Sequence, residues 1–228
     1  MQVIRDIRIY KSDIENIDGN SHPSQFMTKE NNIVTQRIVW KLREADFVLV
    51  DFHHLYINFT TCLSPDTYQF SKRSIDRERK WYRYVDYGVT SEEFQKLDTF
   101  GAEYFADKIQ TLLCEMFLSS DTDRKKIENC ITAALRDGEN MCIRYKEKQS
   151  AKLTAVIYMR LTDSGYLSPL LIVTENISGK EILRENLPLT NSLDQFGTIQ
   201  LSNKRVKINP RKNAYSDVLN LNTIEFDI

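Results

Sequence analysis

The residues best suited to chemistry are an aspartate that follows a proline and an E-x-K group further along the chain. They are Asp66, which follows Pro65, and Glu78 with Lys80. This pattern is typical of Mg²⁺-dependent nucleases, in which two carboxylates hold the metal ion and the lysine ammonium stabilises the developing charge on the phosphate. Such enzymes carry the aspartate and the E-x-K group on neighbouring strands, whereas Pro65 predicts a loop here. A Mg²⁺-dependent nuclease or phosphodiesterase using Asp66, Glu78 and Lys80 is therefore kept as an alternative hypothesis.

The three histidines offer few other catalytic sets. His53 and His54 are adjacent and follow Asp51, and His22 lies far from them in the sequence. Adjacent residues of a strand point to opposite faces, so we expect this pair to be structural rather than to chelate one ion. A metal-binding or general-base role for either histidine is the lesser alternative. The metalloprotease motif H-E-x-x-H and the hydrolase motif G-x-S-x-G are missing, so we predict no catalytic residue, no metal ligand and no cofactor.

The composition excludes several further classes of site. The 228 residues include 7 glycines, none spaced as in the dinucleotide-binding or P-loop motifs that hold phosphates. The 4 cysteines contain no C-x-x-C pair, and we expect them to be reduced and mostly buried. The amino terminus becomes charged too early for a secretion signal, and no apolar run approaches the ~20 residues that span a bilayer. The sequence therefore predicts a cytoplasmic protein without a membrane partner.

Charge is balanced overall but segregated along the chain. The 31 Lys and Arg residues nearly match the 32 Asp and Glu residues, which removes the general attraction of a basic domain for nucleic acid. Locally, residues 72–83 and 204–212 are basic, and residues 86–115 are acidic. The first basic stretch runs into aromatic residues that could stack on bases, but the acidic stretch beside it would repel phosphate. We therefore expect no nucleic-acid partner.

The first part of the chain mixes strand-like and helix-like patterns. Residues 3–10 alternate as in a strand, and a helix capped by Thr28 follows a polar loop. Residues 54–61 and 81–89 alternate again and are rich in aromatic and β-branched side chains. We predict that these two strands pair antiparallel, because such side chains stabilise cross-strand pairs.

Three local signals predict the boundaries of the helices that follow. Thr90 and Glu93 form a capping box, which opens a helical region that Gly101 divides. A last helix runs from residue 121 or 122 to Arg136 and ends at the turn before Gly138.

Beyond residue 140 the pattern predicts strands throughout, joined by hairpin turns. The predicted strands are 141–147, 152–161, 167–175, 180–183, 197–201, 204–208 and 218–226. The polar segment 178–195 can form either edge strands or an ordered loop. We predict an α+β fold with mixed or antiparallel sheets, two to four helices in the N-terminal part and a β-rich C-terminal part. Residues 1–138 and 139–228 form its two lobes, either as separate domains or as one continuous domain.

Three segments between residues 45 and 115, about a third of the chain, carry a family resemblance. They are FHHLYINFTT (Phe52 to Thr61), WYRYVDYGV (Trp81 to Val89) and SEEF (Ser91 to Phe94). Together they resemble the small cytoplasmic immunity proteins encoded beside bacterial polymorphic toxins. The resemblance implies tight stoichiometric binding to a cognate toxin, which blocks the toxin's active site or a surface that it needs. It implies no catalytic residue.

Two patches are candidates for binding such a partner. Acidic side chains would mimic nucleic acid toward a nuclease toxin, whereas Arg, Trp and Tyr dominate interface hot spots. The acidic candidates are Glu92, Glu93, Asp98, Glu103 and Asp107. The competing candidates are Arg79, Trp81, Tyr82, Arg83 and Tyr84. The sequence therefore predicts a non-catalytic, immunity-type protein-binding module, with the nuclease and a scaffold protein of unknown partner as alternatives.

Overall fold

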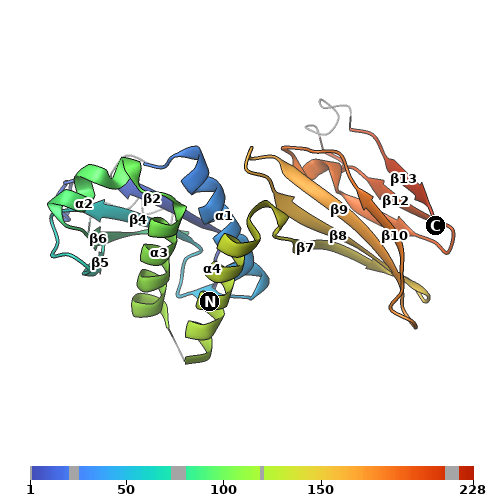
Figure 1. Ribbon diagram of the computed structural model, residues 1–228, viewed down its shortest axis with the longest axis horizontal. Helices are drawn as coiled ribbons and strands as arrows, with labels where there is room; N and C mark the ends of the chain where they lie inside the picture. The colour runs from blue at the N-terminus through green and yellow to red at the C-terminus, as the bar shows by residue number, and fades with distance from the viewer. Residues whose placement is uncertain (1, 21–25, 73–80, 119–120, 214–220) are drawn as a thin grey trace. The chain divides into compact units, whose positions relative to one another are not determined.

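The computed structural model describes residues 2–20, 26–72, 81–118, 121–213 and 221–228. Contacts within the chain divide it into two compact units, Met1–Gly138 and Glu139–Ile228. In the described residues there are four α-helices, all in the first unit, and thirteen strands in mixed and antiparallel sheets (Figure 1). The predicted α+β class is therefore confirmed. No helix in these ranges is both long and apolar enough to cross a bilayer.

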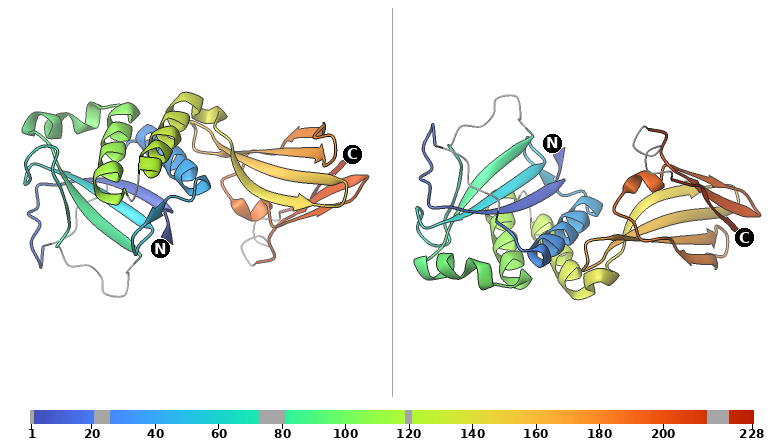
Figure 2. Two further views of the ribbon diagram at one scale, coloured as in Figure 1. Left: turned by 90° about the horizontal axis from the view of Figure 1, so that it is seen from below. Right: turned by 90° about the horizontal axis from the view of Figure 1, so that it is seen from above.

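The first unit contains a four-stranded sheet and helices that pack on it. Its elements are β1 (Gln2–Val3), β2 (Asp6–Lys11), α1 (Lys29–Glu44), β3 (Val48–Leu49), β4 (His54–Thr60), β5 (Tyr68–Phe70), β6 (Tyr82–Gly88), α2 (Ser91–Lys96), the 3₁₀ helix η1 (Leu97–Thr99), α3 (Ala102–Phe117) and α4 (Asp121–Asp137). The sheet has the order β2-β4-β6-β5, and β1 pairs separately with β3. α1, α3 and α4 pack against one another and lie on one face of the sheet (Figure 2).

The strands β2, β4 and β6 are parallel, and only β5 runs antiparallel at the edge. The prediction that β4 and β6 pair antiparallel is therefore wrong. Alternation of side chains determines which residues share a face, but it carries no information on strand direction. Parallel neighbours need a connection of a dozen or more residues, and residues 61–81 provide it. That connection contains β5, a strand that the polar composition of the segment did not reveal.

The helix boundaries follow the predicted signals. The Thr28 side chain accepts a hydrogen bond from the backbone of α1, and both bonds of the Thr90–Glu93 capping box are present at the start of α2. Gly101 immediately precedes α3. α4 ends beside Gly138, whose φ of 51° is the left-handed conformation typical of a helix end. These predictions are confirmed. Each depends on a few neighbouring residues, which is why the sequence alone could predict them.

The second unit consists of two antiparallel sheets. The 3₁₀ helix η2 (Gly138–Asn140) spans the boundary between the units. The elements of the second unit are β7 (Ile143–Gln149), β8 (Leu153–Leu161), β9 (Leu167–Glu175), β10 (Glu181–Asn186), η3 (Leu193–Gln195), β11 (Thr198–Leu201), β12 (Arg205–Asn209) and β13 (Ile224–Asp227). One sheet has the order β10-β9-β8-β7, the other β11-β12-β13, and β11 lies against β7 and β8. Apolar residues of both sheets, such as Ile157, Leu171 and Val206, are fully buried and form the core of this unit.

Candidate functional site

Two aromatic candidates of β6 belong to the core. Tyr82 and Tyr84 are each 8% exposed and pack with Tyr10 and Tyr56 on the face of the sheet opposite α3. The ring centroids of Tyr56 lie 5.2 Å from Tyr82 and 5.1 Å from Tyr84. Burial raises the pKa of Tyr56 to about 12 and also raises the pKa of Tyr84, so both hydroxyls remain protonated. These rings stabilise the fold and are not available to a partner.

The other candidates of this patch differ from these tyrosines in exposure, although the Trp81 ring contacts that of Tyr82 with a centroid distance of 4.9 Å. Arg83 alternates with the tyrosines along β6, and its guanidinium contacts Asp51 at 3.1 Å and lies over the ring of Phe52. Trp81 precedes β6 and is 38% exposed. Arg79 lies outside the described residues. Of the four described candidates, only Trp81 presents a large exposed side chain.

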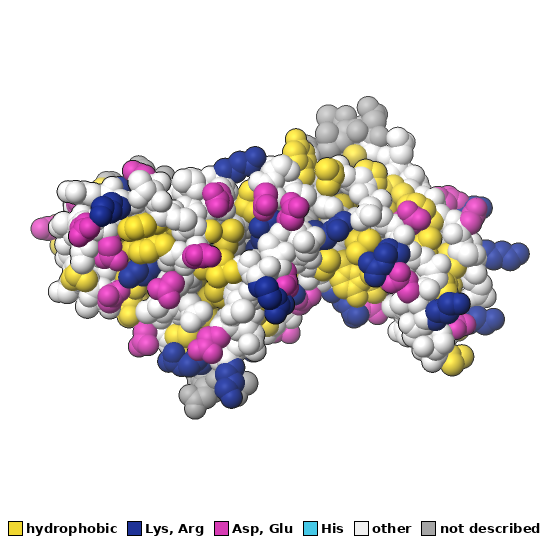
Figure 3. Space-filling view, in the orientation of Figure 1, with side chains coloured by type: hydrophobic (Ala, Val, Ile, Leu, Met, Phe, Trp, Pro, Cys, Tyr) yellow, Lys and Arg dark blue, Asp and Glu magenta, His cyan; other side chains and the backbone are white. Residues whose placement is uncertain are grey.

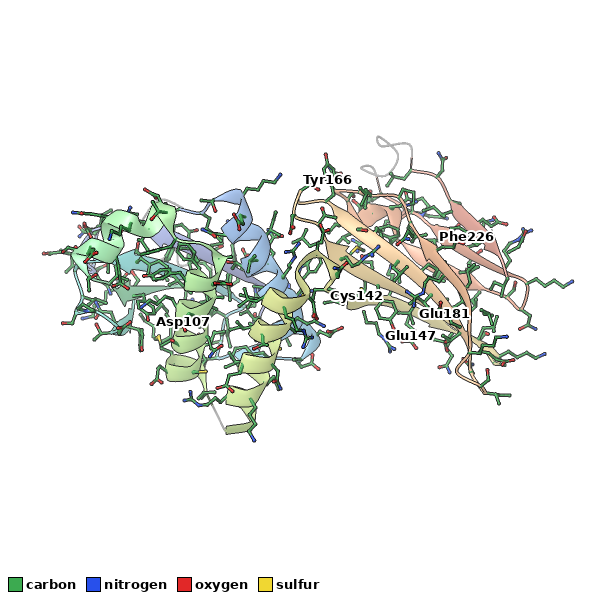
Figure 4. The ribbon with its side chains drawn as sticks, viewed as in Figure 1. Asp107, Cys142, Glu147, Tyr166, Glu181 and Phe226 are labelled. Carbon is green, nitrogen blue, oxygen red and sulfur yellow. The ribbon has the colours of Figure 1, made fainter. Side chains whose placement is uncertain are left out.

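The acidic candidates lie on the surface of α2, η1 and α3. Four of them are exposed, and we call these four residues the acidic face: Glu92, Asp98, Glu103 and Asp107. Figure 3 shows acidic side chains spread over the helices of the first unit, and Figure 4 labels Asp107 on α3. The fifth candidate, Glu93, is half-buried and belongs to a different set of contacts.

Ion pairs are unequally distributed over the acidic face. Glu92 pairs with Lys96 at 2.6 Å, and Asp98 lies 3.7 Å from Lys11. Glu103 and Asp107 lie one turn apart on α3, and no described Lys, Arg or His forms an ion pair with either carboxylate. Like charges at this spacing destabilise a helix by about 0.2–0.5 kcal/mol. This pair therefore costs stability in the isolated protein.

Glu93 belongs to a network around Lys108, which is 13% exposed at its side chain. The Lys108 ammonium lies 2.9 Å from Asp66 Oδ1 and 3.6 Å from Glu93 Oε1. Tyr87 donates a hydrogen bond of 2.9 Å to Asp66 Oδ1, and Tyr104 donates one of 3.3 Å to Glu93 Oε1. The ammonium also lies over both tyrosine rings, at 5.2 and 5.5 Å from their centroids. We call these five residues the Lys108 network.

A tight loop at the carboxyl end of β6 positions Asp66 in this network. The Asp66 N–H donates to the Gly88 carbonyl, and the Gly88 N–H donates to the Thr67 carbonyl, each at 2.9 Å. A Cβ at Gly88 would collide with the Ser64 carbonyl oxygen, so glycine is needed for this close approach. Asp66 itself has a φ of 56°, a left-handed conformation that aspartate adopts more readily than most residues.

The Lys108 network holds its acids ionised and its tyrosines protonated. Hydrogen bonds from Lys108 and Tyr87 lower the pKa of Asp66. Burial opposes ionisation of Glu93, but hydrogen bonds from Thr90 outweigh it and lower the pKa of that carboxyl. Burial raises the pKa of Tyr87 and Tyr104. None of these four groups is shifted toward neutral pH, where a general base would work best, so the network fits a structural role.

The nuclease hypothesis is only partly covered by the described residues. Asp66 contacts Lys108, whereas Glu78 and Lys80 lie outside the described ranges. Sequence reasoning missed Lys108 itself. Its spacing of four residues from Tyr104 was a visible signal of a helical contact, but Asp66 is 42 positions away and only the fold brings it close.

The prediction that His53 and His54 point to opposite faces is wrong. Their Nδ1 atoms contact each other, and their ring centroids are 4.4 Å apart. His53 precedes β4, and the backbone N–H groups of both residues donate to the Trp81 carbonyl, at 3.0 and 3.1 Å, so the chain bends there. Burial lowers the pKa of both imidazoles. No group of three or more described His, Cys, Asp or Glu side chains is placed to hold a metal ion.

All four cysteines are free thiols. Cys114 and Cys130 are buried, Cys62 is exposed and Cys142 is half-buried. Burial raises the pKa of the Cys114 and Cys130 thiols, which makes them poor nucleophiles at neutral pH.

Comparisons of the chain with protein-family models, with curated proteins and with solved structures gave no match.

Proposed function

We propose that this protein is a non-catalytic binding module of the immunity type, which neutralises a bacterial toxin by tight stoichiometric binding through the acidic face. The observation that carries the proposal is the pair Glu103 and Asp107. Both carboxylates are exposed, and their mutual repulsion on α3 has no described cation to relieve it. A basic partner surface would offset this repulsion, so its relief would contribute to the free energy of binding.

The Lys108 network supports this role because it fixes the acidic face in one geometry. It joins α2, through Glu93, to α3, through Lys108, and to the loop that carries Asp66. Asp66 and Glu93 are thereby paired with Lys108, whereas Glu103 and Asp107 have no ion-pair partner among the described residues. A face held by such contacts loses little conformational entropy on binding, which favours high affinity.

The nature of the partner follows from the charge of this face. Exposed carboxylates attract a basic protein surface, and a toxin that acts on nucleic acid must itself have a basic site. An acidic face can occupy such a site in place of the phosphates. Segregated charge also speeds association, as a protein that protects its own cell requires. The competing aromatic patch is less suitable, because Tyr82 and Tyr84 are buried.

Affinity capture with charge-reversal variants tests the proposal. Tagged wild-type protein and the variant Glu103→Lys/Asp107→Lys are expressed at native level in the source organism, and retained proteins are identified by mass spectrometry. The matched control is Glu15→Lys/Asp18→Lys, which makes the same charge change at two exposed acids in the loop after β2.

We expect one basic partner to be retained in stoichiometric amount by the wild type and the control, and at least about 10-fold less by the acidic-face variant, which corresponds to about 1.4 kcal/mol. Rising salt should weaken retention, since exposed charges are screened. Equal retention by all three proteins would refute the acidic face as the binding site.

A further inference from the structure

The amino ends of the parallel strands carry a second cluster of residues that the proposed function does not use. His53 and His54 lie at the start of β4, beside Trp81 at the start of β6. The acidic face begins at α2, after the carboxyl end of β6. Seven-residue strands separate the two ends of the sheet by about 20 Å, so the histidine cluster is a distinct site.

The backbone holds the two histidine rings together. Both N–H groups are bound to the Trp81 carbonyl, and the His53 carbonyl accepts a hydrogen bond of 2.7 Å from the Arg5 backbone. The Nδ1 atoms consequently face each other, with a ring-centroid separation of 4.4 Å. The two Nδ1 atoms are thus held at one point, on neighbouring residues whose backbone is already fixed.

We propose that His53 and His54 bind one transition-metal ion through their two Nδ1 atoms, with Cu²⁺ as the preferred ion. Imidazole nitrogen suits borderline transition metals, and affinity for a given nitrogen site is highest for Cu²⁺ among the divalent first-row ions. Metal–nitrogen bonds of about 2.0 Å at two adjacent corners of a square place the nitrogens about 2.8 Å apart. The two Nδ1 atoms already contact each other, so a rotation of the rings lets both lone pairs converge on one ion.

The proton balance of binding is simple. In the metal-free pair one Nδ1 carries the hydrogen that the other accepts. In the complex both Nδ1 atoms donate their lone pairs to the metal, and each neutral ring carries its hydrogen on Nε2. The hydrogen therefore changes nitrogen within one ring, and no net proton is released. Water molecules complete the coordination, because the described residues provide no third His, Cys, Asp or Glu ligand.

Trp81 provides a direct reporter of the metal. Its ring centroid lies 4.6 Å from that of His54 and 6.1 Å from that of His53. A paramagnetic ion bound to both imidazoles would therefore quench the Trp81 fluorescence. The only other tryptophan is Trp40, in α1. The variant Trp40→Phe leaves Trp81 as the sole tryptophan.

The experiment titrates full-length Trp40→Phe protein with CuCl₂ in a non-coordinating buffer. We expect saturable quenching that ends at one equivalent, and none with MgCl₂, since Mg²⁺ prefers oxygen ligands. Adding His53→Asn/His54→Asn should weaken the binding at least about 10-fold. The matched control is His22→Asn, which removes the third histidine and should leave the titration unchanged. Quenching that is the same in the double variant, or that does not saturate, would overturn the proposal.

Electron paramagnetic resonance of the wild-type protein with one equivalent of Cu²⁺ keeps the proposal testable if the double variant fails to fold. Couplings to two imidazole nitrogens are expected, and one or none would contradict the site. The site is independent of the proposed function. Loss of Cu²⁺ binding without loss of partner capture, or the reverse, shows which of the two proposals has failed.

Discussion

The two stretches predicted as binding surfaces, β6 and the α2–α3 region, differ in how deeply the fold buries them. β6 lies between β4 and β5, and most of its residues are buried on both faces. α2 and α3 each have a face that remains in solvent, where Glu92, Glu103 and Asp107 lie. Aromatic residues in a central strand therefore pack in the core, whereas charged residues on an outer helical face are available for recognition.

The largest expected effect is on the stability of β6. Tyr84→Ala should lower the free energy of unfolding by about 3–5 kcal/mol, because it removes a ring that packs against Tyr10 and Tyr56. Urea unfolding followed by circular dichroism measures the change. Tyr84→Phe is the control and should cost only about 1 kcal/mol, since it keeps the ring and loses the hydroxyl. A loss below about 1 kcal/mol for the alanine variant would return this strand to the candidate surfaces.

Removing the cation of the Lys108 network should have the next largest effect. Lys108→Met keeps most of the side-chain volume but leaves the Asp66 and Glu93 carboxylates without their described cation, so we expect a loss of about 1–2 kcal/mol. Lys96→Met is the matched control, because Lys96 forms an exposed i,i+4 pair with Glu92 and should cost less than about 0.5 kcal/mol. Equal effects would show that the network adds nothing beyond a surface ion pair.

The same network predicts a pH dependence with a defined sign. The pKa values of Asp66 and Glu93 are lowered in the folded protein, so their ionised forms stabilise it above their unfolded values near about 4. That stabilisation is lost as pH falls through the folded values. The unfolding free energy of wild type should therefore fall more steeply below about pH 4 than that of Lys108→Met. Parallel curves for the two proteins would contradict the ion-pair geometry.

A small gain in stability is expected on the acidic face. Asp107→Lys places a cation four residues after Glu103 and replaces a repulsive pair by an attractive one, which should raise the unfolding free energy by about 0.5 kcal/mol. Thermal unfolding measures the shift, with Asp107→Asn as a control that removes the repulsion alone. A destabilisation above about 1 kcal/mol would mean that the Asp107 carboxylate has a structural role.

The smallest effect is expected at Trp81, the exposed member of the aromatic stretch. Trp81→Phe should change the unfolding free energy by no more than about 0.5 kcal/mol, since the side chain is 38% exposed and phenylalanine keeps an aromatic ring beside His54 and Tyr82. The same urea series used for Tyr84 measures it. A larger loss would mean that the full indole, and not only an aromatic ring, is needed at the start of β6.

Predictions that depended on local chemistry agree with the structure. The Thr90–Glu93 capping box, the break at Gly101 and the strands of the second unit each follow from a few neighbouring residues. Errors arose where distant segments meet. The direction of β4 relative to β6 and the partners of Lys108 depend on how the chain returns to the sheet, which alternation of side chains does not encode.

The prediction that the two adjacent histidines point to opposite faces was wrong for a different reason. The rule that adjacent strand residues face opposite sides holds inside a strand, but His53 lies just before β4, where both backbone N–H groups share one carbonyl. Strand boundaries are the least predictable feature of a sequence, and an error of one residue reverses the orientation of a side chain.

The central claim is that the acidic face neutralises a toxin, and growth of cells that express the captured partner tests it most directly. The partner is induced alone, with the wild-type protein, and with Glu103→Lys/Asp107→Lys. We predict arrested growth in the first case, restored growth in the second and continued arrest in the third. Growth that is unaffected by the partner alone, or equal protection by wild type and variant, would contradict the claim.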